Sequence, residues 1–136
     1  MSKVQKLRVA MLGTFTALVT TMGLTTSTQA AEVMPAAYSD CPSQHVCFWT
    51  GDNGTGSMCY WSGDDPDWRS GAITCSWSAT RRAQSVYNNG TSGASVSYYT
   101  GANYSGRVGC TARGGYGNFE GNGGAGYYLR SHRWSC

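Results

Sequence analysis

The sequence predicts an all-β fold, a sandwich of two Greek-key motifs stapled by disulfide bonds. Three observations support this prediction: a turn motif that recurs fifty residues downstream, short segments of alternating apolar and polar residues, and six cysteines in a chain of 136 residues. Gly and Asn occur every few residues, as short strands joined by tight turns require. We expect one domain at this length.

The recurring motif reads CFWTGDNGTGS at residues 47–57 and SYYTGANYSGR at residues 97–107. The two copies share an aromatic residue, a Thr-Gly pair, an Asn and a second Gly at the same spacing. A second match downstream aligns Ser85 with Ser131. Each copy therefore predicts one unit of antiparallel strands. The two expected Greek keys span about 46–90 and about 96–136.

The first 30 residues have the three parts of a secretory signal peptide. Three basic residues precede an uncharged stretch at 9–24, and Thr28-Gln29-Ala30 places small residues just before the expected cleavage point. The uncharged stretch is shorter than the roughly 20 strongly apolar residues of a membrane span. The predicted organisation is a signal peptide at 1–30, a flexible leader at 31–40 and a folded domain at 41–136.

The exported part of the chain is formally neutral. Residues 31–136 contain seven Arg, five Asp, two Glu and no Lys. Binding to a phosphate backbone or to an anionic membrane surface depends on many cationic contacts, which this part lacks. We therefore expect a secreted, extracellular monomer with no nucleic-acid partner and no membrane contact after signal cleavage.

All six cysteines lie after residue 40, and an even number of cysteines in an exported chain predicts a disulfide framework. A zinc site is the competing interpretation, but the chain has no Cys-x-x-Cys pair and only two His. Six cysteines allow 15 pairings, among which the sequence alone does not choose. The simplest expectation is sequential local pairing: Cys41–Cys47, Cys59–Cys75 and Cys110–Cys136.

The Tyr-x4-Tyr-x-Gly motif at residues 99–106 resembles the aromatic-x4-aromatic-x-Gly signature of βγ-crystallin Greek keys. The resemblance implies a βγ-crystallin-like sandwich, in which a Ser late in each unit bonds back to the folded hairpin. Ser85 and Ser131 occupy those places. The first unit departs from the pattern, because Gly54 stands where the second aromatic residue is expected. This departure predicts a looser hairpin corner in the first unit.

A narrower resemblance comes from the CPSxxxCFW opening at 41–49, SVYNNG at 85–90, the signal peptide and the cysteines. Together they resemble the secreted actinobacterial peptidase inhibitor family, whose prototype activity is inhibition of metalloproteases. The resemblance implies an extracellular protease of the metalloprotease type as the partner. Related βγ-crystallin-like proteins include secreted killer-toxin-like and chitin-binding antifungal proteins.

Many βγ-crystallins bind calcium through an Asn/Asp-Asn/Asp-x-x-Ser/Thr-Ser motif. The corresponding stretches here, 80–85 and 126–131, have neither a carboxylate nor an Asn in the first two places, and each contains Arg. Calcium needs six or more oxygen ligands, usually including anionic ones. We therefore expect no calcium site, no other metal and no cofactor.

Catalytic patterns are scarce. Asp64, Asp65 and Asp67 could suggest acid–base chemistry, but Asp and Pro are ordinary turn formers, and we expect a solvated turn. His45 and His132 have no Ser or Cys nucleophile at motif spacing. The sequence therefore predicts a protein that binds a partner and is not an enzyme.

The segment Ala72-Ile73-Thr74, beside Cys75, is the candidate inhibitory loop. A disulfide-anchored loop is preorganised, which lowers the entropy cost of entering a protease cleft. Metalloproteases often favour a bulky apolar residue just after the bond that they cleave, and Ile73 fits that position. The simpler interpretation is that Ile73 is a core residue of a strand, because Ile is commonly buried.

The alternative function is that of a module that binds a cell-wall polysaccharide or chitin, as an antimicrobial, killer-toxin-like protein does. Trp61, Trp68 and Trp77 fall in the extra loop of the first unit, and exposed aromatic faces stack on sugar rings. The simpler interpretation is that these tryptophans supply the core of a chain with few Leu and Ile. Exposure of several tryptophans in one patch would favour glycan binding.

Overall fold

The computed structural model describes residues 33–136, so the predicted signal peptide lies outside the described residues. In this part the chain forms two antiparallel sheets and two short 3-10 helices, η1 (Ala36–Asp40) and η2 (Asp52–Gly54). None of the helices between residues 33 and 136 is long and apolar enough to cross a membrane. The predicted all-β, disulfide-stapled class is therefore confirmed.

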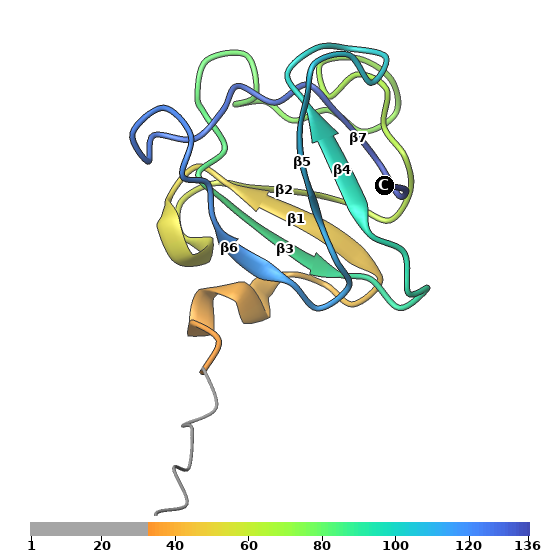
Figure 1. Cartoon of the computed structure of the whole chain (residues 1–136). Helices are drawn as coiled ribbons and strands as arrows, with labels where there is room; N and C mark the ends of the chain where they lie inside the picture. Colours follow the sequence, from red (N-terminus) through yellow and green to blue (C-terminus); the bar gives the residue numbers. More distant parts are fainter. Residues whose placement is uncertain (1–32) are drawn as a thin grey trace, which may run out of the picture. The chain divides into compact units, whose positions relative to one another are not determined.

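The first sheet has four strands in the order β2-β1-β3-β6, and the second has three in the order β5-β4-β7 (Figure 1). The strands of the first sheet are β1 (His45–Trp49), β2 (Met58–Trp61), β3 (Ser85–Asn89) and β6 (Tyr116–Asn118). The strands of the second sheet are β4 (Val96–Tyr99), β5 (Arg107–Thr111) and β7 (Ser131–Arg133).

Each sequence repeat gives its third segment to the sheet of the other repeat. Strand β6 belongs to the second repeat but pairs with β3 of the first. In return, Asp65 of the first repeat bridges to His132 on β7, with N–H to carbonyl distances of 3.1 and 3.0 Å. This exchange is the Greek-key connection that the duplicated motif predicts.

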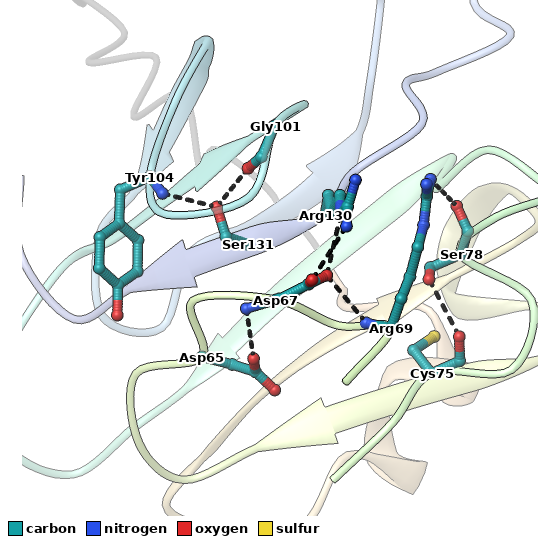
Figure 2. Close-up of polar contacts among 9 residues, drawn as sticks. All are labelled: Asp65, Asp67, Arg69, Cys75, Ser78, Gly101, Tyr104, Arg130 and Ser131. Carbon is teal, nitrogen blue, oxygen red and sulfur yellow. Dashed lines mark hydrogen bonds and ion pairs between the residues drawn. The ribbon is translucent and has the colours of Figure 1, made fainter. Parts of the chain in front are cut away.

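The two late serines hold the two hairpin corners, as the resemblance implies. The Oγ of Ser85 donates to the carbonyl of Gly51 at 2.7 Å and accepts from the N–H of Gly54 at 3.0 Å. The equivalent partners of Ser131 are Gly101 at 2.7 Å and Tyr104 at 3.1 Å (Figure 2). Both serines are fully buried, and each hydroxyl satisfies one carbonyl and one N–H of its hairpin corner.

The first corner lacks the second aromatic residue, and a residue from outside the repeat fills the space. Tyr38, on η1, packs edge-on against Trp49 with ring centroids 5.3 Å apart. A Cβ on Gly54 would lie 2.9 Å from Cδ1 of Tyr38. The expectation of a flexible leader at 31–40 is therefore wrong for residues 36–40, which form η1 (the short orange helix in Figure 1) and bury Tyr38.

The main core lies between the sheets, where Phe48 of β1 and Tyr98 of β4 meet with ring centroids 5.8 Å apart. Alternate residues of β1, Cys47 and Trp49, face the opposite way and form a second cluster with Tyr38. The three disulfides have the expected sequential pairing, and residues 33–136 contain no free cysteine.

Candidate functional site

The predicted inhibitory segment lies in an exposed loop, residues 69–74, between two buried residues, Trp68 and Cys75. All six residues of the loop are exposed, including Ala72 and Thr74. The side chain of Ile73 is 51% exposed, so the simpler interpretation of Ile73 as a core residue is wrong. The structure thus presents a large apolar side chain to solvent at the predicted position.

The carboxyl-terminal end of the loop is fixed by Cys75. This cysteine is bonded to Cys59 on β2, and its N–H donates to the carbonyl of Trp68 at 2.7 Å, which closes the base of the loop. The carbonyl of Cys75 accepts the hydroxyl of Ser78 at 3.0 Å, and the guanidinium of Arg69 donates to the carbonyl of Ser78 at 3.2 Å (Figure 2). Both ends of the loop are therefore tied to the same short segment.

The amino-terminal end of the loop is fixed by an ion pair. Arg130 makes two hydrogen bonds of 2.9 Å to the carboxylate of Asp67 (Figure 2). These bonds hold the pKa of Asp67 at about 2, so the pair is charged at neutral pH. The same carboxylate accepts the N–H of Arg69 at 3.1 Å, and Asp65 accepts the N–H of Asp67 at 2.8 Å. Carboxylates therefore organise the backbone that leads into the loop.

One member of the acidic cluster, Asp65, departs from the solvated turn that the sequence predicts. Asp65 is buried, and its backbone forms the bridge to β7 described above. Asp64 is exposed, but its carboxylate accepts the N–H of Trp134 at 2.7 Å. Each of these carboxylates has a backbone N–H as its partner, an arrangement that stabilises the crossing of the chain between the sheets.

Trp68 anchors the loop in the core through His132. The indole N–H of Trp68 donates to Nδ1 of His132 at 2.8 Å. An indole nitrogen can only donate, so Nδ1 carries no proton and the other ring nitrogen donates to the carbonyl of Gly63 at 2.8 Å. Burial lowers the pKa of His132 to about 4, which keeps the ring neutral at physiological pH.

The three tryptophans proposed for sugar stacking are buried. Trp61, Trp68 and Trp77 are 2%, 0% and 7% exposed, and the rings of Trp61 and Trp68 stack on each other 4.5 Å apart. A sugar ring has no access to these faces, so the predicted stacking patch is wrong. The aromatic residues fill the core because the chain supplies few aliphatic ones.

Residues 33–136 contain no cluster of three or more His, Cys, Asp or Glu that could hold a metal ion.

One exposed residue near the loop was not predicted from the sequence. Tyr60 on β2 is 45% exposed and lines a hollow of about 330 Å³ together with Ile73. Side chains alternate along β2, so Tyr60 lies on the other face of the sheet from its buried neighbour Trp61. This alternation could have identified Tyr60 as an exposed residue.

Comparisons with known proteins agree with this architecture. The family model described as peptidase inhibitor family I36 matches residues 34–111. A solved structure from work on the evolution of the eye lens beta-gamma-crystallin domain fold superposes with a TM-score of 0.52 at 12% identity, covering 68% of this chain and 87% of that chain. At this identity the likeness establishes the fold alone. No curated protein sequence matches the chain. Because the family model covers more than half of its residues, the chain belongs to peptidase inhibitor family I36.

Proposed function

We propose that the protein inhibits a metalloprotease by inserting the exposed loop 69–74 into the active-site cleft of that enzyme. Membership of a peptidase inhibitor family establishes a peptidase as the partner and a binding role in place of catalysis. The observation that carries the choice of loop is the half-exposed Ile73, held between two buried anchors, Trp68 and Cys75. In this loop the Cys59–Cys75 bridge supports a large apolar side chain that is exposed to solvent.

The loop acts as a substrate that the protease binds but releases slowly. The bond between Ala72 and Ile73 lies at the catalytic metal of the protease, which polarises the carbonyl of Ala72. Ile73 enters the apolar subsite that follows the scissile bond. Since the Cys59–Cys75 bridge and the base of the loop fix both ends, little conformational entropy is lost on binding, and cleaved ends stay in place.

We propose further that the protein works outside the cell as a monomer. The signal-peptide pattern of residues 1–30 supports export, and three disulfides suit an oxidising compartment. The neutral charge of residues 31–136 supports neither a nucleic-acid partner nor a membrane partner. With Trp61, Trp68 and Trp77 buried, no residue named for glycan stacking supports a polysaccharide partner.

A titration of the oxidised chain against a thermolysin-like zinc protease and a subtilisin-like serine protease tests this function. We expect stoichiometric loss of zinc-protease activity and much weaker inhibition of the serine protease. Prolonged incubation followed by mass spectrometry should locate slow cleavage between Ala72 and Ile73. Cleavage elsewhere, for example beside the exposed half-cystine Cys110, would contradict the loop assignment while leaving inhibition intact.

A further inference from the structure

We infer that Tyr60 is a specificity-determining residue of this inhibitor. Together with strand β2, it binds an extended segment of the protease at the rim of the active-site cleft. This inference rests on the proposed function, because it extends the contact of loop 69–74 onto the neighbouring strand β2. We call the combination of the Tyr60 ring and the free edge of β2 the Tyr60 surface. Four observations on burial, geometry, backbone pairing and continuity support it.

Exposed apolar residues gather beside the loop. The large apolar side chains that are exposed among residues 33–136 are Val33, Tyr60, Ile73 and Tyr128. Two of these four, Tyr60 and Ile73, line the same hollow of about 330 Å³. Scattered exposed apolar residues are normal, whereas an apolar pair around one concave surface is typical of a binding site.

The ring of Tyr60 is positioned before any partner arrives. Tyr60 lies opposite Cys47 of β1 in the register of the sheet, and its ring lies edge-on against the ring of His45, with centroids 5.3 Å apart. Tyr has few rotatable bonds, so a ring held in this way loses little entropy on binding. Tyr is also one of the residue types enriched at positions that dominate binding energy in protein interfaces.

Strand β2 has a free backbone edge at the same place, because it is the outermost strand of its sheet. The N–H of Thr50 donates to the carbonyl of Ser57 at 3.1 Å, so by alternation Cys59 and Trp61 also face β1. The N–H and carbonyl groups of Met58 and Tyr60 therefore point away from β1. No backbone bond within residues 33–136 joins them to another segment.

The occupant of this surface is the protease that binds the loop. Ile73 belongs both to the loop and to the hollow that Tyr60 lines, so a body seated on the loop also reaches Tyr60. An extended segment can pair with the edge of β2 through backbone hydrogen bonds while one of its apolar side chains enters the hollow. The partner segment is therefore extended, apolar at alternate positions, and located beside the protease cleft.

The test compares two tyrosines that are equally exposed. Tyr60 and Tyr128 are each 45% exposed, but Tyr128 does not line this hollow. The full-length chain in oxidised form, and its Tyr60→Ser, Tyr60→Phe, Tyr128→Ser and Ile73→Ser variants, are titrated against the thermolysin-like protease. Melting temperatures confirm that each variant is folded, and binding kinetics give the association and dissociation rates.

We expect Tyr60→Ser to raise the inhibition constant by about tenfold or more, mainly through faster dissociation. Tyr60→Phe and Tyr128→Ser should stay within about threefold of the wild-type constant, because Phe keeps the ring and Tyr128 lies elsewhere. A wild-type chain that leaves the protease fully active would overturn the proposed function together with this inference. Inhibition that depends on Ile73 but is unchanged in Tyr60→Ser would overturn this inference alone. A concentration-dependent dimer that Tyr60→Ser abolishes would also overturn it, since a second copy would then cover the surface.

Discussion

Trp68 and His132 are joined by a hydrogen bond of 2.8 Å between their rings, in the middle of the core and directly before the exposed loop. The bond needs an unprotonated Nδ1 on His132. Protonation would place two donors against each other and charge a ring that is buried among Phe48 and Trp61. The integrity of the loop base is therefore linked to pH.

The first prediction concerns acid stability. The pKa of His132 is about 4 in the folded chain against an ordinary 6.5, so the unfolded chain binds more protons between these values. The contribution of His132 to the free energy of unfolding should be constant above pH 6.5 and fall as pH drops from about 6.5 to about 4. Urea titrations at several pH values measure this slope. A His132→Gln variant should be less stable at pH 7 and lack the slope in that interval; an unchanged slope would contradict the assignment.

The second prediction separates the Asp67–Arg130 ion pair from His132. The pKa of Asp67 is lowered from 3.8 to about 2, so the stability due to this pair is present above pH 3.8 and is lost as pH falls toward 2. An Asp67→Asn variant should therefore lose the slope below pH 3.8 and keep the one above pH 4. It should also be cleaved faster at the loop, which timed digestion followed by mass spectrometry measures.

The third prediction concerns the disulfide at the loop. Replacing Cys59 and Cys75 together by Ala should turn the inhibitor into a substrate, because the cleaved ends are then free to separate. The loss of stability should be about 3 kcal/mol, the amount expected for a closed loop of roughly 15 residues. Replacing Cys110 and Cys136 together should lower stability but leave inhibition by the remaining folded protein unchanged. Equal loss of inhibition in the two double variants would argue against the special role of loop 69–74.

The fourth prediction concerns the paired serines. Ser85→Ala and Ser131→Ala each leave an N–H and a carbonyl of a hairpin corner without their partner, and these groups are at least partly buried, so the cost is about 1–3 kcal/mol. Thermal unfolding of the two variants should show similar losses, because the two corners have the same bonds. A loss confined to one variant would mean that the corners are not equivalent in energy.

The repeat predicted these corners because the Gly and Ser residues that form them recur in both units. Ser85 lies 34 residues after Gly51 and Ser131 lies 30 residues after Gly101, so aligning the two units with an extra loop in the first identifies both serines. The exchange of strands between sheets was also predictable, since a Greek key has few alternative connections. We also expected each cysteine to pair with the next one along the chain, and the structure confirms this pairing.

Other features were missed because they depend on contacts between distant segments. Tyr38 lies in what reads as a small, Pro-containing leader, and only the missing aromatic residue at Gly54 creates its place. Asp65 is typical of a turn in sequence, but His132, far along the chain, converts it into a strand partner. Ile73 and Trp68 both lie in the extra loop of the first unit, and both are large apolar residues. Their residue types therefore do not reveal that Ile73 is exposed and Trp68 is buried.

The exchange of segments between the sheets of the two repeats has a consequence for folding. A molecule cut between Asn89 and Val96 would yield two fragments, each lacking the piece that completes its own sheet. We expect each fragment to be less stable than the intact chain, and a mixture of the two supplies every strand of both sheets again. The two sheets are therefore completed only by pairing between the repeats, which are far apart in the sequence, and such non-local pairing slows folding.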